Sequence, residues 1–132
     1  MIIEQAILTL LAGTSGVTAL VSNRIYYVQA PQKVDTPYIV FFKVSGNRDH
    51  THDGATGLAN PRFQVDIFGE TYLSVKDVAA QVQAALQGYS GTMGGAGGVA
   101  VNGCFYEDEN DFYGETTKLY HIAQDYILWH RE

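Results

Sequence analysis

The sequence predicts an α+β fold, in which a mostly antiparallel sheet of four or five strands carries one or two helices on one face. Residues 62–68 alternate between polar and apolar side chains, which is typical of a strand with one buried face. Residues 75–86 repeat apolar side chains at helical spacing, which indicates a helix with one buried stripe. Short connections between successive strands favour antiparallel pairing, so the sheet and helix form two layers.

The length and composition predict one ordinary domain that spans residues 1–132, since 46% of the 132 residues are hydrophobic. A net charge of −6 argues against a dedicated nucleic-acid-binding protein and against adhesion to an anionic membrane. We expect no signal peptide, because Glu4 interrupts the apolar start, and no stretch approaches the roughly 20 apolar residues that span a bilayer. Cys104 is the only cysteine, so no internal disulfide is possible, and a free thiol fits a reducing cytoplasm.

The N-terminal half is expected to contain two short helical segments and two strands. Apolar residues recur at helical spacing over residues 3–11, and a further helical turn is expected at residues 17–21. Residues 24–28 predict a short strand, and residues 38–45, dominated by β-branched and aromatic side chains, predict a longer one. Residues 46–61 are polar and contain three glycines, which predicts a long loop.

The C-terminal half begins with the helix at residues 75–86. Ser74 with Asp77 resembles a capping box at its start, although Thr71 could cap it instead. The glycine-rich residues 88–103 predict a loop with a weak strand at its end. A strand at residues 104–107, an acidic loop and a long final strand at residues 119–129 complete the expected elements.

The strand at residues 38–45 points beyond a monomer, because it is apolar on both faces. Two short helices cover about one face of such a sheet, so a neighbouring subunit is expected to cover the other. The alternative is that loops or the chain end fold over that face. If a neighbour covers it, we expect these residues to form the interface: Tyr38, Ile39, Phe41 and Lys43.

Two motifs suggest ligand sites, but their context favours loops. Residues 94–100 contain a G-x-G-x-x-A pattern, yet it follows a helix and precedes strand-like residues, which is the reverse of a dinucleotide site. His50 and His52 could bind a metal ion, but no third or fourth ligand is evident nearby in the sequence. We therefore expect that removing both histidines leaves the fold and its stability nearly unchanged.

No catalytic signature is evident either. The acidic run at residues 107–111 does not match the spacing of a calcium-binding loop, so a solvated acidic loop is favoured. The segment at residues 88–91 lacks the second glycine of a nucleophile elbow, and Cys104 lies among apolar residues, where a thiol is usually inert. We expect no catalytic residues, no cofactor and no structural metal.

The order of landmarks along nearly the whole chain resembles the tail-completion family of long-tailed bacteriophages, whose members are also called tail terminator or tail-to-head joining proteins. The segments that carry the resemblance follow a short N-terminal helix and are VTALVSNRIY at 17–26, APQ at 30–32, PYIVF at 37–41, VSG at 44–46, FQVDIF at 63–68 and YHIAQDY at 120–126. The long glycine-rich segment and the loop with two histidines depart from the usual pattern of the family.

The resemblance implies a structural virion protein rather than an enzyme. Such a protein forms a hexameric ring that caps the head-proximal end of the tail tube, ends its polymerisation and docks on the head-completion or connector proteins. DNA passes through the lumen without specific binding. Assembly would take place in the host cytoplasm, and we expect no membrane association.

Two polar loops, at residues 46–61 and 88–103, are expected to project from the ring and to become ordered on meeting the tube or the head. The first of them holds the residues that we expect to face these partners: Asn47, Arg48, Asp49, His50, His52 and Asp53. Two other functions stay open, namely another neck component, such as a head-completion or minor tail protein, and a small α+β ligand-binding or enzymatic domain.

Overall fold

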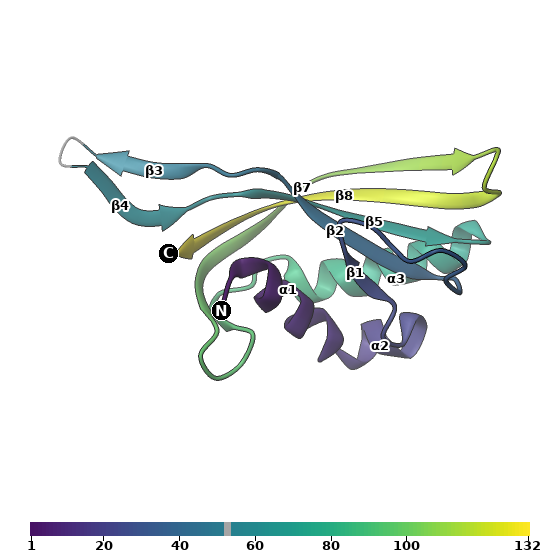
Figure 1. Ribbon diagram of the computed structural model, residues 1–132, viewed down its shortest axis with the longest axis horizontal. Helices are drawn as coiled ribbons and strands as arrows, with labels where there is room; N and C mark the ends of the chain where they lie inside the picture. Colours follow the sequence, from purple (N-terminus) through teal and green to yellow (C-terminus); the bar gives the residue numbers. More distant parts are fainter. Residues whose placement is uncertain (52–53) are drawn as a thin grey trace.

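The computed structural model describes residues 1–51 and 54–132, which form three helices and eight strands (Figure 1). Their bounds, in chain order, are α1 Ile3–Ala12, α2 Ser15–Val21, β1 Ile25–Tyr27, β2 Tyr38–Ser45, β3 Arg48–Thr51, β4 Gly54–Ala59, β5 Arg62–Gly69, α3 Tyr72–Leu86, β6 Gly91–Met93, β7 Val99–Gly114 and β8 Leu119–Arg131.

All eight strands belong to one mixed sheet. The order β1-β2-β5-β8-β4-β3 forms its main path, while β7 pairs with β8 and β6 pairs with β7. β1 and β2 run parallel, and the other pairs are antiparallel. The α+β class is therefore confirmed, but the expectation of four or five strands is wrong in number and misses the parallel pair.

The helices lie on one face of the sheet, and the hydrophobic core fills the space between the two layers (Figure 1). The predicted apolar stripe of α3 is confirmed, because Val75, Val78, Val82 and Leu86 are all buried. Thr71 caps this helix: its hydroxyl accepts a hydrogen bond from the Ser74 backbone N–H at 3.2 Å, so the alternative cap was the right one.

Three segments that the sequence suggested were loops contain strands. Residues 46–61 hold the β3–β4 hairpin, which extends from one end of the sheet (Figure 1). Residues 88–103 contain β6, which was not expected, and the weak strand that was expected at the end of this segment, which is the beginning of β7. The expected acidic loop belongs to β7, a strand of 16 residues that pairs with β8 along most of its length. Backbone pairing with β8 holds this segment as a strand, although its own composition does not favour one.

Candidate assembly surface

The face of the sheet that the helices leave uncovered is the first candidate for contact with other proteins. Because side chains alternate along a strand, every second residue of β2, β5, β7 and β8 lies on this face. We call it the open face and define it by these residues: Tyr38, Val40, Phe42, Arg62, Gln64, Asp66, Phe68, Phe105, Asp108, Asn110, Phe112, His121, Ala123, Asp125, Ile127 and Trp129. Phe105 and Phe112 are 53% and 54% exposed there.

An aromatic row crosses the open face from β2 to β7. The ring centroids of Tyr38 and Phe68 lie 5.0 Å apart, those of Phe68 and His121 lie 4.3 Å apart, and both pairs are stacked. Phe112 extends the row, with its centroid 5.4 Å from that of His121. Stacked aromatic rings offer a large and rigid contact area, which is the composition that protein interfaces favour.

Acidic side chains lie beside this row. Asp66 accepts a hydrogen bond from Gln64 at 2.7 Å, and its Oδ1 lies 3.0 Å from His121 Nε2. Burial raises the pKa of Asp125 above its usual value, and the nearby Asp108 and Asp66 add to that rise. The positive charge of Arg62, whose guanidinium lies 3.6 Å from the Asp125 carboxylate, lowers the same pKa and so opposes this rise. The open face therefore combines apolar area with negative charge that one cation of the same face offsets in part.

The structure corrects the residues expected at the interface. Ile39 and Phe41 are 0% and 1% exposed, because they point into the core beneath the helices. They are therefore not accessible to a neighbouring subunit. Tyr38 does lie on the open face, and Lys43 is exposed and forms an ion pair with Glu4 at 3.6 Å. β2 is apolar on both sides, so its sequence did not indicate which side the helices cover.

The residues expected to face partners lie in and around the β3–β4 hairpin. Asn47 and Arg48 are exposed, and Arg48 Nε donates a hydrogen bond to Glu132 Oε1 at 2.8 Å. The backbone of Asp49 and His50 belongs to β3. His52 and Asp53 lie outside the described residues. Among the side chains that the structure describes, which leave out those of residues 49–56, no group of three or more from His, Cys, Asp or Glu is placed to hold a metal ion.

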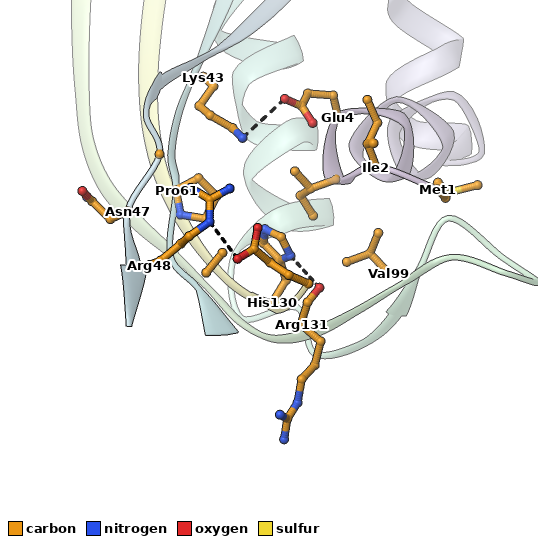
Figure 2. Close-up of a pocket in the computed structure, with 14 residues that line it drawn as sticks. Met1, Ile2, Glu4, Lys43, Asn47, Arg48, Pro61, Val99, His130 and Arg131 are labelled. Carbon is orange, nitrogen blue, oxygen red and sulfur yellow. Dashed lines mark hydrogen bonds and ion pairs between the residues drawn. The ribbon is translucent and has the colours of Figure 1, made fainter. Parts of the chain in front are cut away.

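A pocket lies where the two chain ends meet the base of the β3–β4 hairpin (Figure 2). We call it the terminal pocket. Its volume is about 460 Å³, within the roughly 300–1,000 Å³ that is common for binding sites. In Figure 2 Lys43 faces Glu4 across one side, and His130 lies between Arg48 and Val99. Apolar side chains such as Ile3 and Val99 form part of the wall, and the rim carries charges of both signs.

A chain of hydrogen bonds joins α3 to the β7–β8 pair, and no motif in the sequence indicates it. The fully buried Gln124 donates to the Ala79 carbonyl at 3.1 Å and to Glu109 at 3.0 Å, and it accepts from the Tyr126 hydroxyl at 3.0 Å. Lys76 of α3 continues the chain by donating to Glu109 at 3.0 Å and to Asp111 at 3.1 Å.

The network determines the charge states of its members. Partial burial alone would raise the pKa of Glu109, but hydrogen bonds from Gln124, Lys76 and Tyr106 together hold it below its usual value. The Glu109 hydrogen bond in turn raises the pKa of Lys76. Both groups are therefore charged at neutral pH, and β7 and β8 are held against the first turns of α3.

Cys104 fits the inert role expected from its apolar neighbours. The side chain is 1% exposed, and burial raises the pKa of its thiol to about 12. A thiol is nucleophilic only as the thiolate, so this one is unreactive at neutral pH. Among the described residues no single helix is long and apolar enough to span a membrane, although α1 and α2 meet the length and composition criteria as a pair bent by 80°.

The fold and the family are recognisable by comparison. A chain from a structure titled "Virion of native gene transfer agent (GTA) particle" superposes with a TM-score of 0.80 at 18% sequence identity, covering 97% of this chain and 94% of that one. This likeness shows the fold. A search of curated proteins finds no significant match. The family model described as "Tail completion protein gp17" matches residues 5–131, so the chain belongs to the tail completion protein gp17 family and is a structural tail-completion component of a virion.

Proposed function

We propose that this protein closes the head-proximal end of the phage tail, ends polymerisation of the tail tube and joins the finished tail to the head. The match to the tail completion family over residues 5–131 carries this proposal. The protein acts by occupying a position in the particle and not by catalysis, and it uses no cofactor. Its partners are further copies of the same chain, the tail tube protein and a head-completion or connector protein.

The ring is the form in which one small chain can close a tube. A heterologous contact that repeats around an axis produces a closed ring, and the resemblance to the family implies six copies. The open face supports such a contact, because its aromatic row together with the exposed Phe105 and Phe112 is more apolar area than a solvent-facing sheet usually presents. DNA would cross the lumen without being bound specifically, in keeping with the net charge of −6.

The experiment uses tails made in cells from which the gene for this chain has been deleted. We expect such tails to be irregular in length and to lack heads, as seen by electron microscopy. Adding the purified protein should restore joining to heads. Tails of normal length that carry heads without this chain would contradict the proposal and favour a different position in the neck.

A matched pair of variants tests the open face within the same assay. Phe112→Asp places a charge on the aromatic row, and burying an unpaired charge opposes assembly. Ala84→Asp places the same charge on the exposed side of α3. We expect both variants to fold and only Ala84→Asp to complete tails. If Phe112→Asp completed tails as well as the parent, the open face would not be an assembly surface.

A further inference from the structure

The sheet ends on each side in a strand that has a neighbour on one side only. At the level of β1 the strand order is β1-β2-β5-β8-β7. β6 covers β7 only at residues 99–101, so residues 105–113 of β7 have no backbone partner on their outer side within the part of the chain that the structure describes. β1 likewise pairs only with β2. The free edge of a strand presents unpaired N–H and C=O groups, on which another chain can add a strand.

The backbone of β1 presents one acceptor and one donor at its free edge. The Arg24 carbonyl and the Val28 N–H each form a 2.9 Å hydrogen bond with β2, so the backbone groups of Ile25 and Tyr27, which alternate with them, face away from β2. The Ile25 N–H and the Tyr27 carbonyl are bonded within the local turns. The Ile25 carbonyl and the Tyr27 N–H are therefore available to another strand.

The backbone of β7 presents the matching groups. The Leu128 N–H of β8 donates at 3.1 Å to the residue that precedes β5, so even-numbered residues of β8 face β5 and odd-numbered ones face β7. Asn110 pairs with Ala123 and so directs its backbone groups to β8, whereas those of Glu109 and Asp111 face the free edge.

The two edges also match in level. The Asp108 carboxylate accepts from the Glu109 N–H at 2.9 Å, which leaves the Glu109 carbonyl and the Asp111 N–H available. The strand pairings place five residues in one row across the sheet: Tyr26, Val40, Asp66, Ala123 and Asn110. In a flat ring, whose copies are not shifted along the strands, β1 of one copy therefore meets residues 109–111 of the next.

The charges of the two edges favour contact between unlike edges. Residues 22–36, which contain β1 and the loop after it, hold two cations and one carboxylate, a net charge of +1. Residues 102–113 of β7 hold four carboxylates and no Lys or Arg, a net charge of −4. Two β7 edges brought together would oppose two sets of four carboxylates, and like charges on neighbouring strands are destabilising. The acidic edge of β7 therefore suits the edge of β1 better than a second copy of itself.

We propose that the free edge of β7 in one copy pairs with β1 of the next copy, so that the sheets join around the ring. The Tyr27 N–H donates to the Glu109 carbonyl, and the Asp111 N–H donates to the Ile25 carbonyl. β1 and β7 run in opposite directions, so the new pair is antiparallel. The two edges lie on opposite sides of the sheet, so the contact is head-to-tail and its repetition closes a ring. The inference rests on the ring of the proposed function and specifies the contact between its copies.

The aromatic row of the open face extends from one of these edges to the other. The ring centroids of Tyr26 and Tyr38 lie 6.5 Å apart, so the row begins at β1, and it ends at β7 with Phe112. In the proposed pair Tyr26 lies opposite Asn110 and diagonal to Phe112, and diagonal neighbours are within reach of aromatic side chains. Pairing therefore continues the row from copy to copy and covers Phe112, which is 54% exposed in the monomer.

Cysteine cross-linking on completed tails tests the pairing directly. Tyr26→Cys and Asn110→Cys would face each other across the contact with their Cβ atoms about 5 Å apart, close enough for a disulfide. Within one copy the two positions are four strand spacings apart, about 19 Å, so a disulfide between them joins different copies. Oxidation of the double variant should therefore give a ladder of covalent oligomers on a denaturing gel.

The matched control combines Tyr26→Cys with Asn102→Cys, an exposed position of β7 beside β6, and should give no ladder. The native Cys104 is buried and does not take part. Completed tails that contain the first pair and yield no ladder would overturn the inference and leave the proposed function standing. A covalent dimer of the Asn110→Cys single variant would also overturn it, because two β7 edges would then pair with each other.

A proline substitution supplies a second, independent readout. Asp111→Pro removes the N–H that faces the free edge and leaves the bonds between β7 and β8 in place, as proline is tolerated on an edge strand. Asp111→Ala loses the same carboxylate contacts with Tyr72 and Lys76 but keeps the N–H, so the two variants differ in the backbone donor. At equal melting temperature, Asp111→Pro should be recruited to tails about tenfold less than Asp111→Ala. Equal recruitment of the two folded variants would refute the pairing, whereas failure of the parent chain to complete tails would refute the proposed function.

Discussion

The two faces of the sheet are built from the same strands and differ in where their side chains find partners. On the covered face, Ile39 and Phe41 of β2 are enclosed by the helices, and Gln124 forms hydrogen bonds within the chain. On the open face, Phe112 is exposed beside a row of stacked rings. Because side chains alternate along a strand, neighbouring residues have different roles. Those on the covered face stabilise the fold, and those on the open face are available for assembly.

The polar groups follow the same division. On the covered face, Gln124 forms hydrogen bonds with Tyr126 and Glu109 of the same chain. The open face instead holds Asp125 near Asp108 and Asp66, whose negative charges help to raise its pKa. The repulsion between like charges within a monomer is reduced when a partner places a cation beside them. A face-to-face pair of identical open faces would add to that repulsion, which favours a head-to-tail arrangement of copies.

The largest effect should come from a cavity on the covered face. Phe41→Ala removes a ring that is almost fully buried, and we expect a loss of about 3–5 kcal/mol in the free energy of unfolding. Phe42→Ala, one residue later on the open face, should cost about 1 kcal/mol, because that ring is only half-buried. Urea denaturation followed by circular dichroism measures both. Equal losses for the two variants would mean that the faces do not differ in the monomer.

The same pair of faces shows which parts of the fold were predictable from the sequence. The strand β5 and the helix α3 carry clear apolar periods, β2 is a run of β-branched and aromatic residues, and the bounds of all three were close to those expected. The β3–β4 hairpin and the middle of β7 were missed, because their polar and glycine residues have no apolar period and are ordered by pairing. Which face of β2 the helices cover depends on packing between elements that are distant in the sequence, and local patterns do not record it.

The site was less predictable than the fold. The exposed position of Arg48 follows from its polar neighbours, but the pairing of Arg48 with Glu132 brings together residues from opposite ends of the chain. His130 lies two residues after the buried Leu128 and therefore on the same face of β8, so the strand period could have indicated that it is buried. Nothing in the sequence indicates that it lines a pocket between the two chain ends.

A smaller effect is expected from the hydrogen-bond network on the covered face. Gln124→Ala leaves the Tyr126 hydroxyl without its acceptor and removes a donor from Glu109 and from the Ala79 carbonyl. We expect a loss of about 1–3 kcal/mol in the free energy of unfolding, because buried polar atoms lose their partners. Gln64→Ala on the open face should change it by about 0.5 kcal/mol or less. Thermal unfolding compares them, and a Gln124→Ala variant as stable as the parent would show that the network does not hold α3 to the sheet.

The smallest effect is expected from thiol labelling at two adjacent positions of β7, one on each face of the sheet. Cys104 is 1% exposed on the covered face, and Phe105 is 53% exposed on the open face. The thiol of Cys104 has a pKa of about 12 because it is buried, so it should not react with a thiol reagent such as 5,5′-dithiobis(2-nitrobenzoate) until urea unfolds the chain. Phe105→Cys should add one thiol that reacts at once in the free protein. On completed tails that thiol should become protected, because a partner covers the open face. A rate that is the same in the free protein and on tails would place this end of the open face in solvent and restrict the assembly surface to the aromatic row.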